Sequence, residues 1–182
     1  MSNDSTAPGY LTPVGDNPAY DQELERQVSR WLRGITGLDA KVVYPRWTDP
    51  QTQIPRNGIT WCEFGITVAD QDDFQADIQI SDEQSEQWTW EKISIIFCFY
   101  GPQGNAMASI FRAGMFVEQN SNTLKANTGL SLTDVTKILN LPVLINNQWV
   151  RRYDLTVTLS RKNTRTFNVR TVTTPNVIVN GE

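Results

Sequence analysis

The sequence predicts an α+β protein, in which a mixed and mainly antiparallel β-sheet of five to six strands is flanked by two principal helices. Two stretches repeat apolar residues every three to four positions, as helices with one buried face do, and several others alternate apolar and polar residues, as half-buried strands do. The 182 residues suit a single domain with its own core. We expect this domain over residues 18–172, after a flexible arm over 1–17 and before a C-terminal tail over 173–182.

The first helix is expected to begin with Asn17 as its cap and Pro18 at its first position, because both residue types favour those places. Gly37 is expected to end it, since glycine readily adopts the left-handed conformation found after a helix C-terminus. Between them, six apolar side chains share one face: Tyr20, Leu24, Val28, Trp31, Leu32 and Ile35. This amphipathic pattern indicates a helix that lies on an apolar surface.

Three strands are predicted next along the chain. Residues 41–47 should form an edge strand, because Pro45 lacks the amide hydrogen that a central strand needs. An exposed loop over 48–58 separates it from an alternating strand over 59–68, and residues 74–80 form a third strand after an acidic turn. Four residues of the alternating strand are expected on its apolar face: Cys62, Phe64, Ile66 and Val68.

The stretch 88–100 gives the strongest strand pattern, and near its end it is apolar on both faces, which is typical of a central, covered strand. A second principal helix is predicted over 103–117, and a shorter helical segment over 120–129 should end at Gly129. Four residues of the second helix are expected to face inward: Met107, Ile110, Phe111 and Met115.

The last part of the chain is predicted to be β-structure, with strands over 130–138 and 148–161. The segment Lys162-Asn163-Thr164 is expected to turn the chain. Residues 165–172 would then return beside the preceding strand and complete a long late β-hairpin.

The sequence contains no histidine, which removes the usual imidazole general base, the Ser-His-Asp and Cys-His mechanisms and most transition-metal sites. Cys62 and Cys98 lie inside apolar strand-like runs, which favours buried free thiols over a disulfide. We therefore expect no enzyme, no metal site and no cofactor. The sequence has neither an apolar run of about 20 residues nor a secretory signal, which predicts folding in a cytosol, away from membranes.

A glycine turn, Gly101-Pro102-Gln103-Gly104, joins the central strand to the second helix, a place where many enzymes hold a phosphate. It lacks the Lys-Ser/Thr pair of a phosphate-binding loop and the glycine spacing of a dinucleotide site. We interpret it as an architectural joint. The acidic pairs Asp72-Asp73 and Asp82-Glu83 are a possible site for a hard cation, but the calcium-loop pattern is missing, which favours solvent-exposed turns.

Charge is distributed unevenly along this chain of net charge −4. Residues 63–91 contain nine acidic and no basic residues, whereas 151–170 contain six basic residues against Asp154 alone. Two explanations of this pattern are open. The acidic and basic segments form two solvated faces, or they form two surfaces that meet head to tail on adjacent copies of the chain. The tryptophans at 88 and 90 share a strand face, which indicates a ligand or partner platform, a cover for the sheet or a subunit contact. The candidate interface residues are Arg151, Arg152, Arg161, Lys162, Arg165, Asp72, Asp73, Asp82, Glu83, Trp88 and Trp90.

Five stretches, taken in order, resemble the tail-terminator (neck-terminator) proteins of tailed bacteriophages. They are RQVSRWLRGITGL (26–38), YPRW (44–47), WCEFGI (61–66), CFYGPQGNAMASIFRAGM (98–115) and RRYDLTVTLSR (151–161). In that family a helix ends in a similar W-x-R-G-x-T-G and a W-C-x-F-G strand follows. A strand ending in F-Y-G-P then leads into a helix, and a late strand carries R-R-x-D-L. The resemblance does not cover residues 1–17 and 173–182.

The resemblance implies a structural virion protein of the tail or neck, with no catalytic residues. It further implies a hexameric ring, assembled in the host cytoplasm, that caps the tail tube and joins it to the head–tail connector. The implied partners are further copies of the chain, the tail-tube protein and the connector or neck protein, with the tail sheath as a further candidate. DNA would pass through the ring without specific binding, and the segment 160–165 would project toward a neighbouring ring.

Two other classes of function remain open on the residues alone. One is a carboxylate-dependent, virion-associated hydrolase, which needs two carboxylates about 5–9.5 Å apart across a cleft. The other is a monomeric ligand-binding module that uses Trp88 and Trp90 as an exposed aromatic platform.

Overall fold

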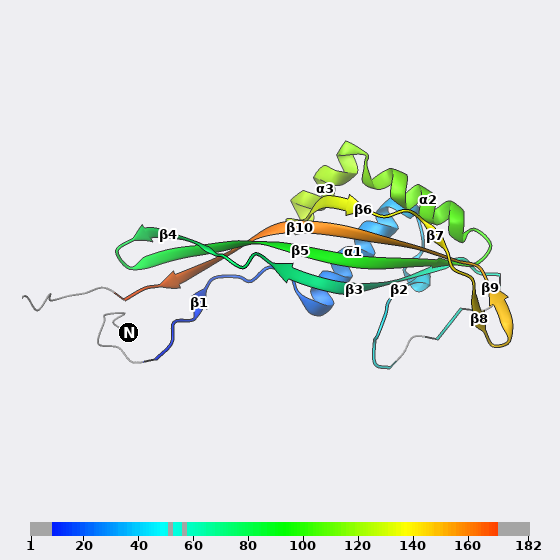
Figure 1. Ribbon diagram of the computed structural model, residues 1–182, viewed down its shortest axis with the longest axis horizontal. Helices are drawn as coiled ribbons and strands as arrows, with labels where there is room; N and C mark the ends of the chain where they lie inside the picture. The colour runs from blue at the N-terminus through cyan, green and yellow to red at the C-terminus, as the bar shows by residue number, and fades with distance from the viewer. Residues whose placement is uncertain (1–8, 51–52, 56–57, 171–182) are drawn as a thin grey trace, which may run out of the picture. The chain divides into compact units, whose positions relative to one another are not determined.

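The computed structural model describes residues 9–50, 53–55 and 58–170, and the following statements concern these residues (Figure 1). The fold is α+β, as predicted: a mixed, mainly antiparallel sheet has the strand order β1-β10-β5-β3-β2 and is accompanied by three α-helices. Its eight strands exceed the expected five to six because two of them, β1 and β7, are two-residue strands. None of the described helices is long and apolar enough to cross a membrane.

The helices are α1 (Asp21–Thr36), α2 (Gly104–Met115) and α3 (Glu118–Thr128), with a short 3₁₀ turn η1 (Ala40–Val42). The first five strands are β1 (Pro13–Val14), β2 (Val43–Pro45), β3 (Trp61–Gln71), β4 (Ala76–Ser81) and β5 (Gln84–Tyr100). The later strands are β6 (Ser131–Val135), β7 (Leu139–Asn140), β8 (Val143–Ile145), β9 (Gln148–Val150) and β10 (Arg152–Asn168).

The chain divides into two compact units, to which β5 and β10 both contribute. Unit 1 comprises residues 1–18, 72–90 and 162–182, and unit 2 comprises residues 19–71 and 91–161. The predicted tail over 173–182 and the first part of the predicted arm lie outside the described residues, as do parts of the predicted loop over 48–58.

Unit 2 contains the apolar core, where all three helices pack on one face of the sheet. Alternate residues of β5 supply its centre, and α2 contributes Phe111, whose ring lies 4.8 Å from that of Phe97 and 5.0 Å from that of Trp31. The predicted helix face is confirmed in α1, where Leu24, Val28 and Leu32 are buried. The helix packs because its apolar stripe matches the apolar side of the sheet.

The predicted start of α1 at Asn17 and Pro18 is wrong, since the helix begins at Asp21 with an extended Tyr20 as its cap residue. The carbonyl of Ala19 accepts a hydrogen bond from Arg161 Nη1 over 2.7 Å, and the Arg161 guanidinium lies 4.5 Å from the centre of the Tyr20 ring. These tertiary contacts hold residues 19 and 20 in an extended path, which outweighs the local capping preference. The predicted terminator Gly37 is confirmed, with φ of 72° and its amide donating to the Arg33 carbonyl.

Two expected core residues lie at the surface instead. Val68 is 51% exposed because the β3–β5 register shifts between Ile66 and Val68, and a bulge of this kind reverses the alternation of the strand. Ile110 is 44% exposed because the buried side of α2 runs through Ala108, Phe111 and Met115. The C-terminus of α3 at Gly129 agrees with the sequence prediction.

The predicted late β-hairpin is wrong, because β10 continues from Arg152 to Asn168 without a turn. Buried Arg161 and Asn163 alternate with exposed Lys162 and Thr164, so the Lys-Asn-Thr segment keeps the two-residue period of a strand. The segment 162–164, which was expected to turn, therefore lies inside β10 and forms no projecting tip.

The second face of the unit 2 sheet carries a smaller apolar cluster, in which Trp61 stacks on Tyr100 with ring centres 3.9 Å apart. The β8–β9 hairpin packs on it through Val143, Ile145 and Val150. At the edge, β2 pairs in parallel with β3, as the proline in this strand predicted for an edge position.

Unit 1 is a small sheet without a helix among its described residues. Here β4 pairs antiparallel with the first part of β5, and β1 pairs antiparallel with the last part of β10. The Val169 amide donates to the Glu83 carbonyl over 2.9 Å, and Lys162 Nζ lies 4.5 Å from the centre of the Trp88 ring. The predicted strand over 74–80 and its acidic turn are thus found in β4 and its connection to β3.

Candidate functional site

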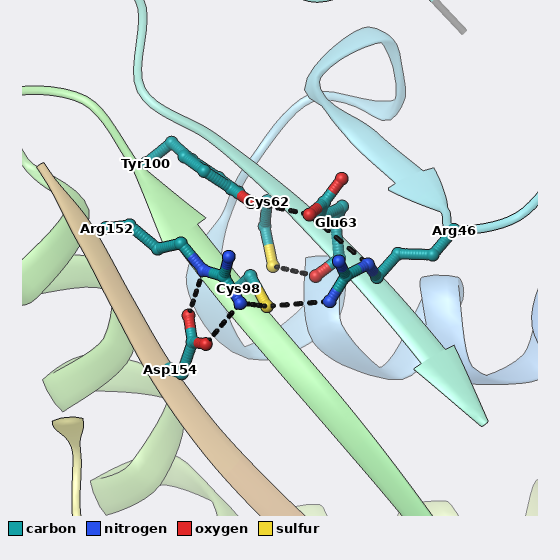
Figure 2. Close-up of polar contacts among 7 residues, drawn as sticks. All are labelled: Arg46, Cys62, Glu63, Cys98, Tyr100, Arg152 and Asp154. Atoms are coloured by element: carbon teal, nitrogen blue, oxygen red, sulfur yellow. Dashed lines mark hydrogen bonds and ion pairs between the residues drawn. The ribbon is translucent and has the colours of Figure 1, made fainter. Parts of the chain in front are cut away.

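A polar cluster lies on the second face of the unit 2 sheet, where three strands run side by side (Figure 2). Glu63 of β3 is the register partner of Cys98 of β5, and Tyr100 follows on the same face of β5. The Tyr100 hydroxyl donates to Glu63 Oε1 over 2.5 Å, and Arg46 Nε lies 3.3 Å from the same oxygen. One carboxylate therefore ties together three segments of the chain.

Arg152 and Asp154 of β10 form the other half of the cluster. The guanidinium binds the carboxylate through two hydrogen bonds, with Nε to Oδ1 at 2.8 Å and Nη2 to Oδ2 at 2.5 Å, and these bonds raise the pKa of Arg152. Arg152 Nη2 and Arg46 Nη1 each lie 3.4 Å from Cys98 Sγ. The charges of the two arginines and the two carboxylates balance, and each charged group is paired within the cluster. We interpret the cluster as a structural link between the strands.

The two thiols are buried and free, as the sequence predicted. Burial raises the pKa of Cys98 to about 12, and the Asp154 carboxylate adds to this, while Arg152 and Arg46 act in the opposite direction. Burial likewise raises the pKa of Cys62 well above its usual value. A thiol needs its thiolate form to act as a nucleophile, so neither cysteine is suited to covalent chemistry near neutral pH.

The glycine turn at 101–104 is an architectural joint, as predicted. A Cβ on Gly101 would lie 2.3 Å from the carbonyl oxygen of Ile59, and the residue has a φ of 90°, which glycine adopts most easily. A Cβ on Gly104 would lie 3.0 Å from the ring of Tyr153. Close approach within the subunit therefore accounts for glycine at both positions.

The basic candidate residues occupy different environments. Arg151 is exposed, whereas Arg152 belongs to the polar cluster. Arg161 is only 2% exposed and pairs with Glu91, with Nε and Oε2 2.5 Å apart. Lys162 lies over Trp88, and Arg165 is half-buried beside a cavity of about 210 Å³ that also contacts Trp88. Of these five residues, Arg151 and Lys162 are exposed, and the other three are half-buried or buried.

The acidic candidates Asp72, Asp73, Asp82 and Glu83 are all exposed and all belong to unit 1. Trp90 is 47% exposed, while Trp88 is half-buried, so the two rings do not form an open platform of equal faces. Among the described residues, no group of three or more His, Cys, Asp or Glu side chains is arranged to hold a metal ion.

The two units carry opposite net charge. Unit 1 has nine acidic and three basic residues, a net charge of −6, and unit 2 has eleven acidic and thirteen basic residues, a net charge of +2. The acidic segment noticed in the sequence thus falls mostly in one unit. The unit boundaries, which the sequence pattern did not indicate, are what reveal the contrast.

Two surface features escaped the sequence prediction. The first is Phe74, which is 91% exposed in the connection between β3 and β4, next to the acidic pair at 72–73. The second is a groove of about 530 Å³ in unit 2 between α1 and α3. Its lining residues are Gln27, Arg30, Trp31, Gly34, Ile35, Asn120, Thr123, Leu124, Asn127 and Thr128. An aromatic residue inside an acidic run was visible in the sequence, but the groove requires the helix packing.

In the part of the chain that the structure describes, the charged candidate residues are either paired with other side chains or at least partly exposed. The sequence profile of the phage neck terminator protein family matches residues 22–182, and the chain belongs to this family. The match extends beyond the quoted motifs, which span 26–161, to residue 182. A comparison with curated proteins gives no match. Membership implies a structural role in the phage virion, at the tail or neck, and the family is not a family of enzymes.

Proposed function

We propose that this protein assembles in the host cytoplasm into a closed ring, expected to be hexameric, that caps the tail tube and joins it to the head–tail connector. The tail-tube protein and the connector are its partners in this proposal, with the sheath as a further candidate. DNA passes through the ring without specific binding. The family supplies the virion role, and the ring is our proposal from the distribution of charge.

The opposite net charge of the two units is the observation that carries the proposal. A contact between unit 1 of one copy and unit 2 of the next would join −6 to +2, and a series of such contacts uses both units of every copy. Contacts between two different patches of identical subunits are head-to-tail, and they close into a ring when the rotation allows it. Charge complementarity of this kind mainly selects the partner and speeds encounter.

The proposal is tested by native mass spectrometry and electron microscopy of the full chain, alone and with purified tail tubes. We expect closed oligomers of one size, at least on the tubes, and less assembly as salt rises, because salt screens exposed charges. A chain that stays monomeric at all salt concentrations and does not bind tubes would contradict the proposal.

A pair of variants examines the charge argument directly. Asp82→Lys/Glu83→Lys reverses two exposed charges of unit 1 and should weaken assembly at low salt by at least tenfold. The control, Asp70→Lys/Asp134→Lys, makes the same change at exposed positions of unit 2 and should leave assembly intact or strengthen it. Equal effects of the two variants would show that the charge difference between units does not guide assembly.

A further inference from the structure

We propose that the connection between β3 and β4 of one copy docks in the groove between α1 and α3 of the next copy, with Phe74 as the apolar anchor. This inference rests on the proposed ring and assigns its subunit contact. It commits to a second copy of the chain as the occupant of the groove, for the reasons of shape, hydrogen bonding and charge that follow.

The groove has an apolar floor, and at Gly34 it contains open space that no described atom of the same subunit fills. Its floor is formed by Trp31 and Ile35, which are half-buried, and by the buried Leu124. Gly34 lies in the middle of this lining, and a Cβ there would meet no atom within 4 Å. A glycine inside a helix destabilises it by about 1 kcal/mol relative to alanine, so its presence here calls for a reason.

Gly114 of α2 is a helical glycine whose presence the structure does explain. A Cβ on Gly114 would lie 2.4 Å from Cγ2 of Ile35, so this glycine is required by packing within unit 2. Gly34 has no such neighbour in the described part of the subunit. The open space above Gly34 is therefore suited to a close approach from outside.

The groove also contains an unused hydrogen-bond acceptor. Gln27 lines it, and the Oε1 atom of this side chain is buried without a hydrogen-bond partner among the described residues. Buried polar atoms are nearly always paired, since an unpaired one costs about 1–3 kcal/mol. A backbone amide of an incoming loop would supply the missing donor.

Phe74 is the exposed aromatic residue of unit 1 whose surroundings match this groove. It follows Asp72 and Asp73, and Asp77 comes three residues later. Tyr10, which is equally exposed, has no charged residue between Gly9 and Val14. Large aromatic side chains bury much apolar area with little loss of side-chain entropy, which is why they are frequent anchors of interfaces.

The rim of the groove carries the complementary charge. Arg30 lines it with a side chain that is 70% exposed, and Arg26 lies one turn earlier on α1 and is 62% exposed. Both arginines share a single carboxylate, that of Glu23, at 4.0 Å and 3.1 Å. Lys125 is exposed on α3. The acidic pair at 72–73 would therefore meet an excess of positive charge when Phe74 enters.

A cross-linking experiment tests the contact. Two tagged, full-length variants, Gln75→Cys and Thr123→Cys, both of which keep Phe74, are mixed under assembly conditions, on tail tubes if these are needed, and treated with a short thiol cross-linker. The native thiols are both buried and give little background. We expect a product containing both tags, and at least tenfold less of it when Tyr10→Cys replaces Gln75→Cys. Equal products from the two pairs, or no product containing both tags, would overturn the inference.

Two substitutions of Gly34 test the groove itself. Gly34→Leu fills the open space, and Gly34→Ala leaves most of it open while giving the helix a similar gain in propensity. We expect both variants to fold with unchanged circular dichroism, and Gly34→Leu alone to raise the concentration needed for assembly at least tenfold. If both variants assemble like the unmodified chain, the groove is not the contact although the ring stands. If the unmodified chain forms no ring on tubes, the result contradicts the proposed function itself, and not only the groove contact.

Discussion

Unit 1 and unit 2 are built on the same two strands, but they are stabilised in opposite ways. All buried hydrophobic residues among those described belong to unit 2, where three helices cover one sheet face. The buried residues of unit 1 are polar: Ser85, Thr89 and Asn163. Several of its large apolar residues are exposed, with Ile78 at 52%, Ile80 at 54% and Phe74 at 91%.

This difference indicates which part of the chain supplies the stability of the isolated subunit. A sheet without a covering layer gains little from the hydrophobic effect, and its side chains remain available for contacts with other molecules. Unit 2 has the burial that a stable fold requires. We therefore expect unit 2 to supply most of the free energy of unfolding of the isolated chain.

The largest effect is expected from Phe111→Ala in unit 2. The Phe111 ring packs against those of Trp31, Phe97 and Phe99, and its removal leaves a cavity in the core. We expect a loss of about 4 kcal/mol in the free energy of unfolding, measured by urea denaturation. Ile110→Ala, at the neighbouring exposed position, is the control and should cost less than about 1 kcal/mol. Similar losses for both variants would mean that α2 packs by another face.

A somewhat smaller effect is expected from Glu91→Leu, at the buried ion pair beside the apolar core of unit 2. Glu91 and Arg161 are 1% and 2% exposed and form an ion pair, and Gln71 Nε2 donates to the other Glu91 oxygen over 3.3 Å. Glu91→Leu leaves the buried guanidinium without its partner and should lower the free energy of unfolding by about 3 kcal/mol.

The double variant Glu91→Leu/Arg161→Met shows whether this loss comes from the unpaired charge. It should recover part of the stability, because an apolar pair can replace a buried ion pair at little cost. Recovery should stay incomplete, since the Ala19 carbonyl loses the hydrogen bond from Arg161. If the double variant is less stable than Glu91→Leu, the charge was not left unpaired and this account of the site is wrong.

The smallest effect is expected in unit 1. Ile78→Ser replaces an exposed apolar residue of β4 and should change the free energy of unfolding of the isolated chain by less than about 0.5 kcal/mol. A loss above about 2 kcal/mol in the same urea experiment would show that unit 1 has an apolar core of its own. The contrast between the two units would then no longer hold.

The sequence predicted most of the fold because its strongest patterns are also its most buried segments. The two faces of β5 and the inner stripe of α1 follow from simple periodicity, and Gly37 and Gly129 end their helices as expected. Two of the errors share a physical cause. The start of α1 and the straight course of β10 both depend on Arg161, whose buried pairing with a residue 70 positions away leaves no local pattern.

The candidate site was less accessible to prediction from sequence. The acidic residues of unit 1 could be found from composition, but Arg152 and Arg161 share the same basic segment and have internal roles that only tertiary contacts reveal. The groove between α1 and α3 depends on the distance between two helices that are far apart in sequence. The sequence contained the anchor Phe74, but it gave no indication of a receptor for it.

The placement of the two thiols has a consequence for a particle that leaves its host. Cys62 belongs to the helix-covered core and Cys98 to the opposite sheet face, so the sheet itself separates the two sulfur atoms. Outside the cell, the protein meets oxygen without the reductants of the cytoplasm. With the sulfur atoms kept apart, protonated and shielded from solvent, the neck should retain the same covalent structure in both surroundings.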